Sequence, residues 1–144
     1  MANPSSAIRQ YCEQHGFSRL VRDGGFDYLL RRWDRIVAQV DEGYHGLFVE
    51  YLNDMDARRI LNELQPLASA EERAGFERLA PSLDDRFLRV TRPVDFCIWG
   101  KETATKRGYR HDRDWWYYRV PTNLSRVSDR EEWEGGLVAD GAGF

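Results

Sequence analysis

The sequence predicts a predominantly helical α+β fold, with five or six amphipathic helices followed by a C-terminal antiparallel β-hairpin packed on them. The first observation is that apolar residues recur at helical spacing through most of residues 6–90. The second is a pair of aromatic, strand-like runs, residues 94–99 and 115–120, which follow the helix-stopping pair Arg92-Pro93. A single hairpin is marginally stable alone, so it must lie on the helices.

Residues 1–43 predict two helices. Ser5 or Ser6 can cap a short helix that runs to about His15 and stops at Gly16. A turn at residues 23–25 separates it from the strongest stripe in the chain. That stripe comprises Phe26, Leu29, Leu30, Trp33, Ile36, Val37 and Val40, and Gly43 closes the helix.

Further helices follow up to residue 90. A stripe from Tyr44 to Leu52 is expected to end in a tight bend at residues 53–56, after which a second helix runs to Pro66. Ser69 and Glu72 form a capping-box start for the next helix. Pro81 lies inside that helix pattern, so it either kinks one helix or occupies the first turn of another.

The hairpin is expected to pair Val94, Phe96 and Ile98 with Trp116, Tyr118 and Val120 on the face toward the helices. Asp95, Cys97, Trp99, Trp115, Tyr117 and Arg119 then form the outer face, and residues 100–114 form a long loop. Residues 1–121 are expected to be one domain. Residues 122–144 are expected to be an acidic, glycine-containing tail, partly ordered at most.

Composition narrows the class of protein. At 144 residues, 42% hydrophobic and 31% charged, the chain has the balance of a soluble globular domain. A net charge of −3 makes nucleic acid an unlikely partner, because nucleic-acid-binding domains are usually basic. No apolar run is long enough to span a membrane, and no signal peptide is visible. We therefore expect a cytoplasmic protein in which Cys12 and Cys97 are ordinary thiols.

The outer hairpin face is the leading candidate binding surface. Trp99, Trp115, Tyr117 and Arg119 have the composition of an interface hot spot. Interleaved aromatic and arginine side chains could also stack on single-stranded bases. The alternative is that the tail, through Trp133 and Phe144, or a second copy of the chain covers this face.

The 101–114 segment carries five basic and three acidic residues in an acidic protein. Lys106, Arg107 and Arg110 could bind an anion there, or the segment could be a solvated loop. His111 with Arg110 and Arg113 resembles the acid–base and phosphate-binding groups of a metal-independent nuclease.

Glu50, Asp54 and Asp56 could bind a hard cation or form an arginine–carboxylate network with Arg58 and Arg59, although acidic residues at a helix start also cap free N–H groups. The chain has no Cys-His metal spacing, nucleophile elbow or phosphate-binding glycine loop, and no cofactor is expected.

The general form, a compact acidic helical protein with a small aromatic β element, is similar to that of some bacterial immunity and antitoxin proteins. The sequence therefore predicts a non-enzymatic protein-binding module whose partner is another protein or itself, in a possible homodimer. The alternative is an RNA-binding protein or metal-independent nuclease that uses residues 101–114.

Overall fold

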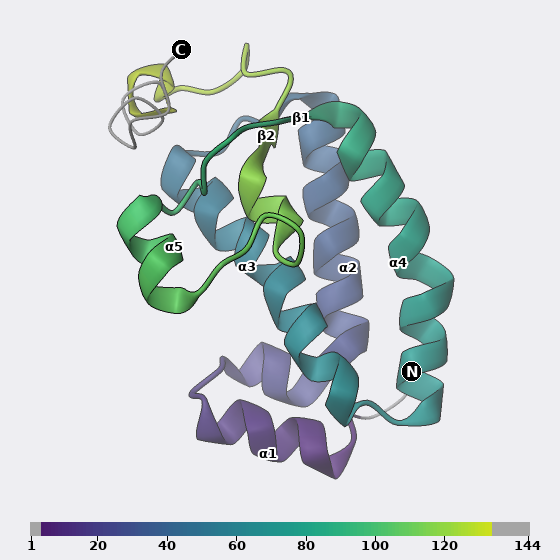
Figure 1. Cartoon of the computed structure of the whole chain (residues 1–144). Coiled ribbons are helices and arrows are strands. Elements are labelled where there is room, and N and C mark those ends of the chain that lie inside the picture. The colour runs from purple at the N-terminus through teal and green to yellow at the C-terminus, as the bar shows by residue number, and fades with distance from the viewer. Residues whose placement is uncertain (1–3, 134–144) are drawn as a thin grey trace.

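Five helices carry most of the chain in the computed structural model, which describes residues 4–133 (Figure 1). They are α1 (Ser6–Gln14), α2 (Arg19–Gly43), α3 (Phe48–Leu64), α4 (Ala70–Val90) and α5 (Lys101–Arg107). Two 3-10 turns, η1 (Gln65–Leu67) and η2 (Trp115–Tyr118), and the strands β1 (Thr91–Pro93) and β2 (Arg119–Pro121) complete the fold. The strands pair antiparallel. The predominantly helical α+β class is therefore confirmed.

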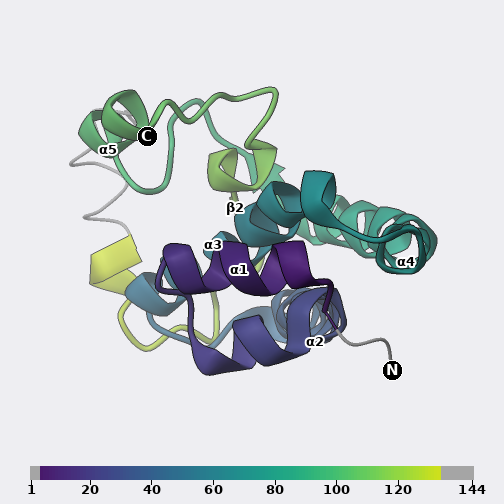
Figure 2. The ribbon, with the colours of Figure 1, turned by 90° about the horizontal axis from the view of Figure 1, so that it is seen from below.

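The core lies between the three long helices. Helix α2 packs against α3 on one side and α4 on the other, and α1 lies beside the first turns of α2 (Figures 1 and 2). All seven residues of the stripe predicted for α2 are buried, from Phe26 to Val40. This burial is why the stripe holds its period for four turns: an apolar face of that length must be covered.

Short polar side chains begin three of the helices. The Ser5 hydroxyl accepts a hydrogen bond from the Ile8 N–H, and Ser18 does the same for Val21. Ser69 and Glu72 form the reciprocal pair of a capping box. The caps predicted at Ser5 and Ser69 are confirmed.

The turn predicted at residues 23–25 is a sharp kink within α2. Gly25 has φ of +54° and ψ of −138°, a backbone conformation that side chains disfavour. A Cβ there would lie 3.0 Å from Cγ of Pro4. The kink thus turns the first part of α2 back along α1 (Figure 2).

The bend predicted at residues 53–56 is wrong. Helix α3 continues through it, because Tyr51 and Met55 keep one face buried across the polar stretch. The acidic residues there bind side chains outside α3: Asp54 accepts from the hydroxyl of Tyr44, which lies between α2 and α3, at 2.7 Å. Pro81 lies inside the single helix α4.

The predicted strands are also misplaced. Residues 94–99 form no strand, residues 115–118 form η2, and the ladder pairs Thr91 with Pro121 and Pro93 with Arg119. Proline has no N–H to donate, but Pro93 and Pro121 occupy pairs that exchange no hydrogen bonds, because the neighbouring bonds join Val90 with Thr122 and Val94 with Tyr118. The two segments still run side by side, since the N–H of Val94 donates to the Tyr118 carbonyl oxygen at 2.9 Å.

The loop predicted at 100–114 contains helix α5. Gly100, at φ of +98°, precedes the helix, and Gly108, at φ of +69°, ends it in the left-handed conformation. No residue of α5 is buried, and the helix lies apart from α2 and α4 (Figures 1 and 2). The segment therefore projects a short helix from the body of the protein.

Trp133 is wholly buried, but not over the predicted hairpin face. Its ring packs against Tyr44, Phe48 and Tyr51, with centroids 5.0–5.7 Å away. Phe144, the other residue expected to cover that face, lies outside the described residues. Within residues 4–133, no helix is long and apolar enough to cross a membrane.

Candidate functional site

The predicted aromatic face does not exist as one surface. Tyr117 is fully buried, and Trp115 is half-buried, with its ring centroid 6.1 Å from that of Phe87 and 5.4 Å from that of Trp116. A strand would have placed alternate side chains on one face, whereas the 3-10 turn η2 directs three successive aromatic residues inward. These aromatic side chains contribute to the core.

Arg119 has a structural role at the end of α4. Its guanidinium donates to the carbonyl oxygens of Leu88 and Thr91 at 3.1 and 2.9 Å, and to the Thr91 hydroxyl at 2.8 Å. These bonds satisfy carbonyl groups that a helix end leaves without a partner. Arg119 is therefore engaged within the fold.

Three of the predicted binding residues do come together. Trp99, Lys106 and Arg107 line a hollow of about 250 Å³ between α5 and α3, with Asp56 and Thr103 completing its wall. We call it the Trp99 hollow. The Trp99 indole supplies apolar surface to the hollow, and the two basic residues supply positive charge.

A second hollow, of about 350 Å³, adjoins the first, because Arg107 lines both. Its other lining residues are Arg59, Asn62, Glu63, Tyr109, Arg113 and Asp114. We call it the arginine hollow, because three guanidinium groups face it. They come from α3, from the end of α5 and from the segment before η2, so only the folded chain assembles them.

A hydrogen-bonded network lies behind both hollows. The Tyr117 hydroxyl donates to Asp56 Oδ1 and accepts from Arg59 Nε at 3.1 Å, and Trp99 Nε1 donates to Asp56 at 3.3 Å. Burial, together with the Asp56 carboxylate, raises the pKa of the Tyr117 hydroxyl. Tyr117, predicted as a contact residue, instead orients the residues that line the hollows.

Arg59 is held firmly in its charged form. Burial alone would lower its pKa, but the neighbouring Tyr117, Glu63 and Asp56 outweigh burial and raise it. Its Nη1 lies 2.6 Å from Glu63 Oε1, one helical turn along α3.

Two cations beside the hollows have no partner within residues 4–133. Lys106 and Arg107 are exposed on the last turn of α5, and neither forms a hydrogen bond or ion pair with a described residue. Positive side chains in the last turn of a helix also interact favourably with the negative end of the helix macrodipole. Their charge is nevertheless available to an anionic ligand.

The residues of the nuclease alternative do not line one hollow. Arg113 faces the arginine hollow and binds Asp114 at 3.0 Å, whereas Arg110 pairs with Asp112 at 3.0 Å on the exposed surface. The ring of His111 is exposed and lies 4.5 Å from that of Tyr118.

The three carboxylates considered for a cation have separate partners. Glu50 accepts from the Leu47 N–H at 3.1 Å, Asp54 binds Tyr44, and Asp56 belongs to the network behind the hollows. Burial raises the pKa of Asp54 above its ordinary value, against the opposing effect of its Tyr44 hydrogen bond. In the part of the chain that the structure describes, no three metal-ligating side chains gather.

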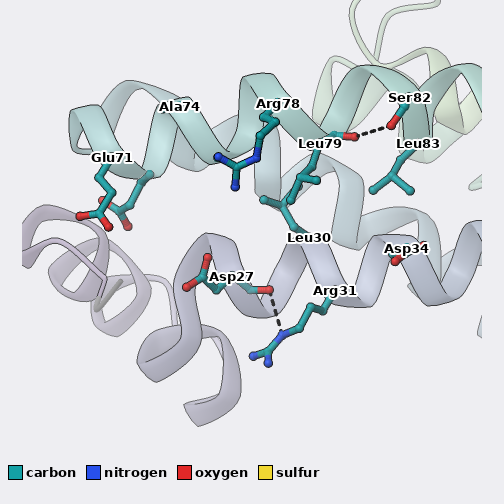
Figure 3. A pocket seen from close by; sticks show the side chains of 12 residues that line it. Asp27, Leu30, Arg31, Asp34, Glu71, Ala74, Arg78, Leu79, Ser82 and Leu83 are labelled. Carbon is teal, nitrogen blue, oxygen red and sulfur yellow. Dashed lines mark hydrogen bonds between the residues drawn. The ribbon is translucent and has the colours of Figure 1, made fainter. Parts of the chain in front are cut away.

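Another hollow, of about 500 Å³, lies between α2 and α4 (Figure 3). Leu30, Leu79 and Leu83 line its apolar part, and charged residues of both signs surround them. These are Asp27, Asp34, Glu71 and Glu72, with Arg31 and Arg78. The mixed charge selects no class of ligand, and the sequence predicted no site among these residues.

Of the residues that α3 contributes, Asn62 and Glu63 were missed by sequence reasoning, and Arg59 was considered only as part of an arginine–carboxylate network. The spacing of Arg59 and Glu63 predicts an ion pair on one helix face, but not what that face opposes.

No protein-family model matches this chain, and comparisons with curated proteins and with solved structures gave no match either.

Proposed function

We propose that this chain is a non-enzymatic protein-binding module, and that the surface around α5 is where its partner docks. The observation that carries the proposal is the position of Lys106 and Arg107. Both are exposed and unpaired within residues 4–133, and they border two adjoining hollows beside the Trp99 indole. Trp and Arg are among the residue types enriched at interface hot spots, and Trp99 and Arg107 line the same hollow.

The composition of the surface favours an acidic partner. Positive charge near α5 would attract acidic groups from a distance and orient the partner on approach. The rest of the chain is acidic, with a net charge of −3 overall. The basic surface around α5 is therefore small, and it matches a partner protein that presents a few acidic side chains.

The RNA-directed alternative has less support. A platform for single-stranded bases needs exposed aromatic rings, and Tyr117 is buried while Trp115 is half-buried. The Arg110–Asp112 pair also places an acidic group beside the cation that would contact phosphate.

Photo-crosslinking tests the proposal directly. A photoreactive amino acid replaces Thr105, which is exposed on α5, in the full chain expressed in its own cells. We expect a discrete protein adduct, either with a second protein or with another copy. The combined change Lys106→Glu and Arg107→Glu should abolish the adduct, because it reverses the charge at both hollows.

The matched control places the same photoreactive group at Arg35, which is exposed on α2, a helix that lies apart from α5 (Figures 1 and 2). An adduct that survives the charge reversal, or equal labelling from Arg35, would contradict the proposal. A Thr105 adduct that ribonuclease removes would favour the RNA alternative.

A further inference from the structure

Three guanidinium groups face the arginine hollow, and two of them are fixed in place. Arg59 is held by Glu63 at 2.6 Å and by the Tyr117 hydroxyl at 3.1 Å. Arg113 is held by Asp114 at 3.0 Å and donates to the Gly108 carbonyl oxygen at 2.5 Å. Both are therefore oriented before any ligand arrives, which lowers the entropy cost of binding.

The third, Arg107, has no partner among residues 4–133. It lies at the end of α5, directly before Gly108, the residue whose carbonyl oxygen accepts from Arg113. A guanidinium has five N–H donors in a planar fork that matches a carboxylate or phosphate. The arginine hollow is thus lined by two guanidinium groups that are already oriented and by one, that of Arg107, whose donors have no partner among residues 4–133.

We propose that the arginine hollow is the seat for a single carboxylate side chain, glutamate or aspartate, of the docked partner. This inference rests on the function proposed above and names the group that is recognised.

Charge balance favours a carboxylate over a phosphoryl group. The hollow is lined by three arginines and two carboxylates, Glu63 and Asp114, so one positive charge is left over. A monoanion neutralises that charge. A phosphoryl group carries nearly two negative charges at neutral pH and would leave an excess beside Glu63 and Asp114. The hollow's volume of about 350 Å³ has room for one side chain.

The test uses the full chain and small probes whose binding is followed by NMR of the arginine Nε–H groups. The probes are N-acetyl-glutamate amide, its neutral counterpart N-acetyl-glutamine amide, and inorganic phosphate. We expect saturable shifts of the Arg59, Arg107 and Arg113 signals with the glutamate probe and none with the glutamine probe. Arg107→Gln should weaken glutamate binding by about tenfold, the worth of one charged hydrogen bond.

Arg35→Gln is the matched control, because it removes the same charge from an exposed residue of α2 and should leave binding unchanged. Phosphate binding more tightly than the glutamate probe would overturn the carboxylate assignment. The absence of saturable shifts with either anion would overturn the site itself.

The two proposals fail separately. If the Thr105 adduct forms but the glutamate probe does not bind, the docking surface stands and the carboxylate seat is refuted. If the probe binds but no protein adduct forms, the seat stands as an anion site and the protein-binding function is refuted.

Discussion

Arg58 carries a positive charge into the core, where its side chain is only 6% exposed. Its guanidinium binds Asp84 through two hydrogen bonds, of 3.0 and 2.9 Å, and Trp33 Nε1 donates to the same carboxylate at 3.0 Å. The guanidinium also lies over the Trp116 ring, 5.1 Å from its centroid. One ion pair thus joins α2, α3 and α4.

We predict that Asp84→Ala lowers the free energy of unfolding by about 3–5 kcal/mol, because it leaves Arg58 charged and buried without a counterion. The double change Arg58→Met and Asp84→Leu should cost less, since it removes both charges and keeps most of the volume. Urea denaturation measures both variants. A loss of under about 1 kcal/mol for Asp84→Ala would show that the pair contributes little.

At the scale of an element, α3 depends on a residue far along the chain for its N-terminal cap. Its N-cap residue, Leu47, has no side-chain oxygen to offer. Instead Asp129 Oδ2 accepts from the Phe48 N–H at 2.9 Å, while Oδ1 accepts from Trp133 Nε1 at 2.9 Å. The segment after β2 therefore closes the beginning of α3 and covers its aromatic residues.

We predict that Trp133→Ala lowers the free energy of unfolding by about 3–5 kcal/mol through the cavity it leaves. Asp129→Ala should cost about 1 kcal/mol, the usual worth of a cap. Thermal unfolding followed by circular dichroism measures both, with Glu131→Ala, an exposed change in the same turn, as the control. Equal stability of Trp133→Ala and Glu131→Ala would refute this anchoring role.

At the scale of the whole molecule, buried tyrosines link stability to alkaline pH. Tyr51 and Tyr117 are 0% exposed, and burial raises the pKa of each hydroxyl above its ordinary value of 10.0. Above pH 10 the unfolded chain loses these protons while the folded chain keeps them. The unfolded state then binds fewer protons, so the free energy of unfolding falls as pH rises.

We predict cooperative alkaline unfolding in which the phenolate absorbance of these tyrosines rises together with the loss of helical circular dichroism. Each such tyrosine should contribute a slope of about 1.4 kcal/mol for each pH unit above 10. Tyr51→Phe should reduce the total slope by about 1.4 kcal/mol for each pH unit, because it removes one of the titrating protons. Full ionisation of all seven tyrosines near pH 10 in a protein that stays helical would contradict the prediction.

Helices α1 to α4 could largely be predicted, unlike α5, because their signals are local. The stripe from Phe26 to Val40 and the caps at Ser5 and Ser69 act within a few residues, and the structure confirms them. The bend predicted in α3 failed because a polar stretch can bind partners elsewhere in the fold, as Asp54 does with Tyr44.

The aromatic runs near the C-terminus show the limit of the same reasoning. The alternation of side chains predicted strands there. Instead, a 3-10 turn directs the rings of Trp116 and Tyr117 into the core, and only three residues of each segment pair as strands. Strand propensity measures fit to a half-buried surface, so the available surface decides whether a strand forms.

By itself, the sequence determined the predominantly helical α+β class, both ends of α1 and α4, the C-terminal ends of α2 and α3, and the basic character of the segment around Lys106 and Arg107. Only the tertiary structure decided that Tyr117 is buried, that Trp133 covers the beginning of α3, and that Arg59 faces Arg107 and Arg113. The physical reason is the separation along the chain between the residues that interact. Periodicity and capping act between neighbours in the chain, whereas a hollow is formed by residues from distant segments whose approach depends on how the helices pack.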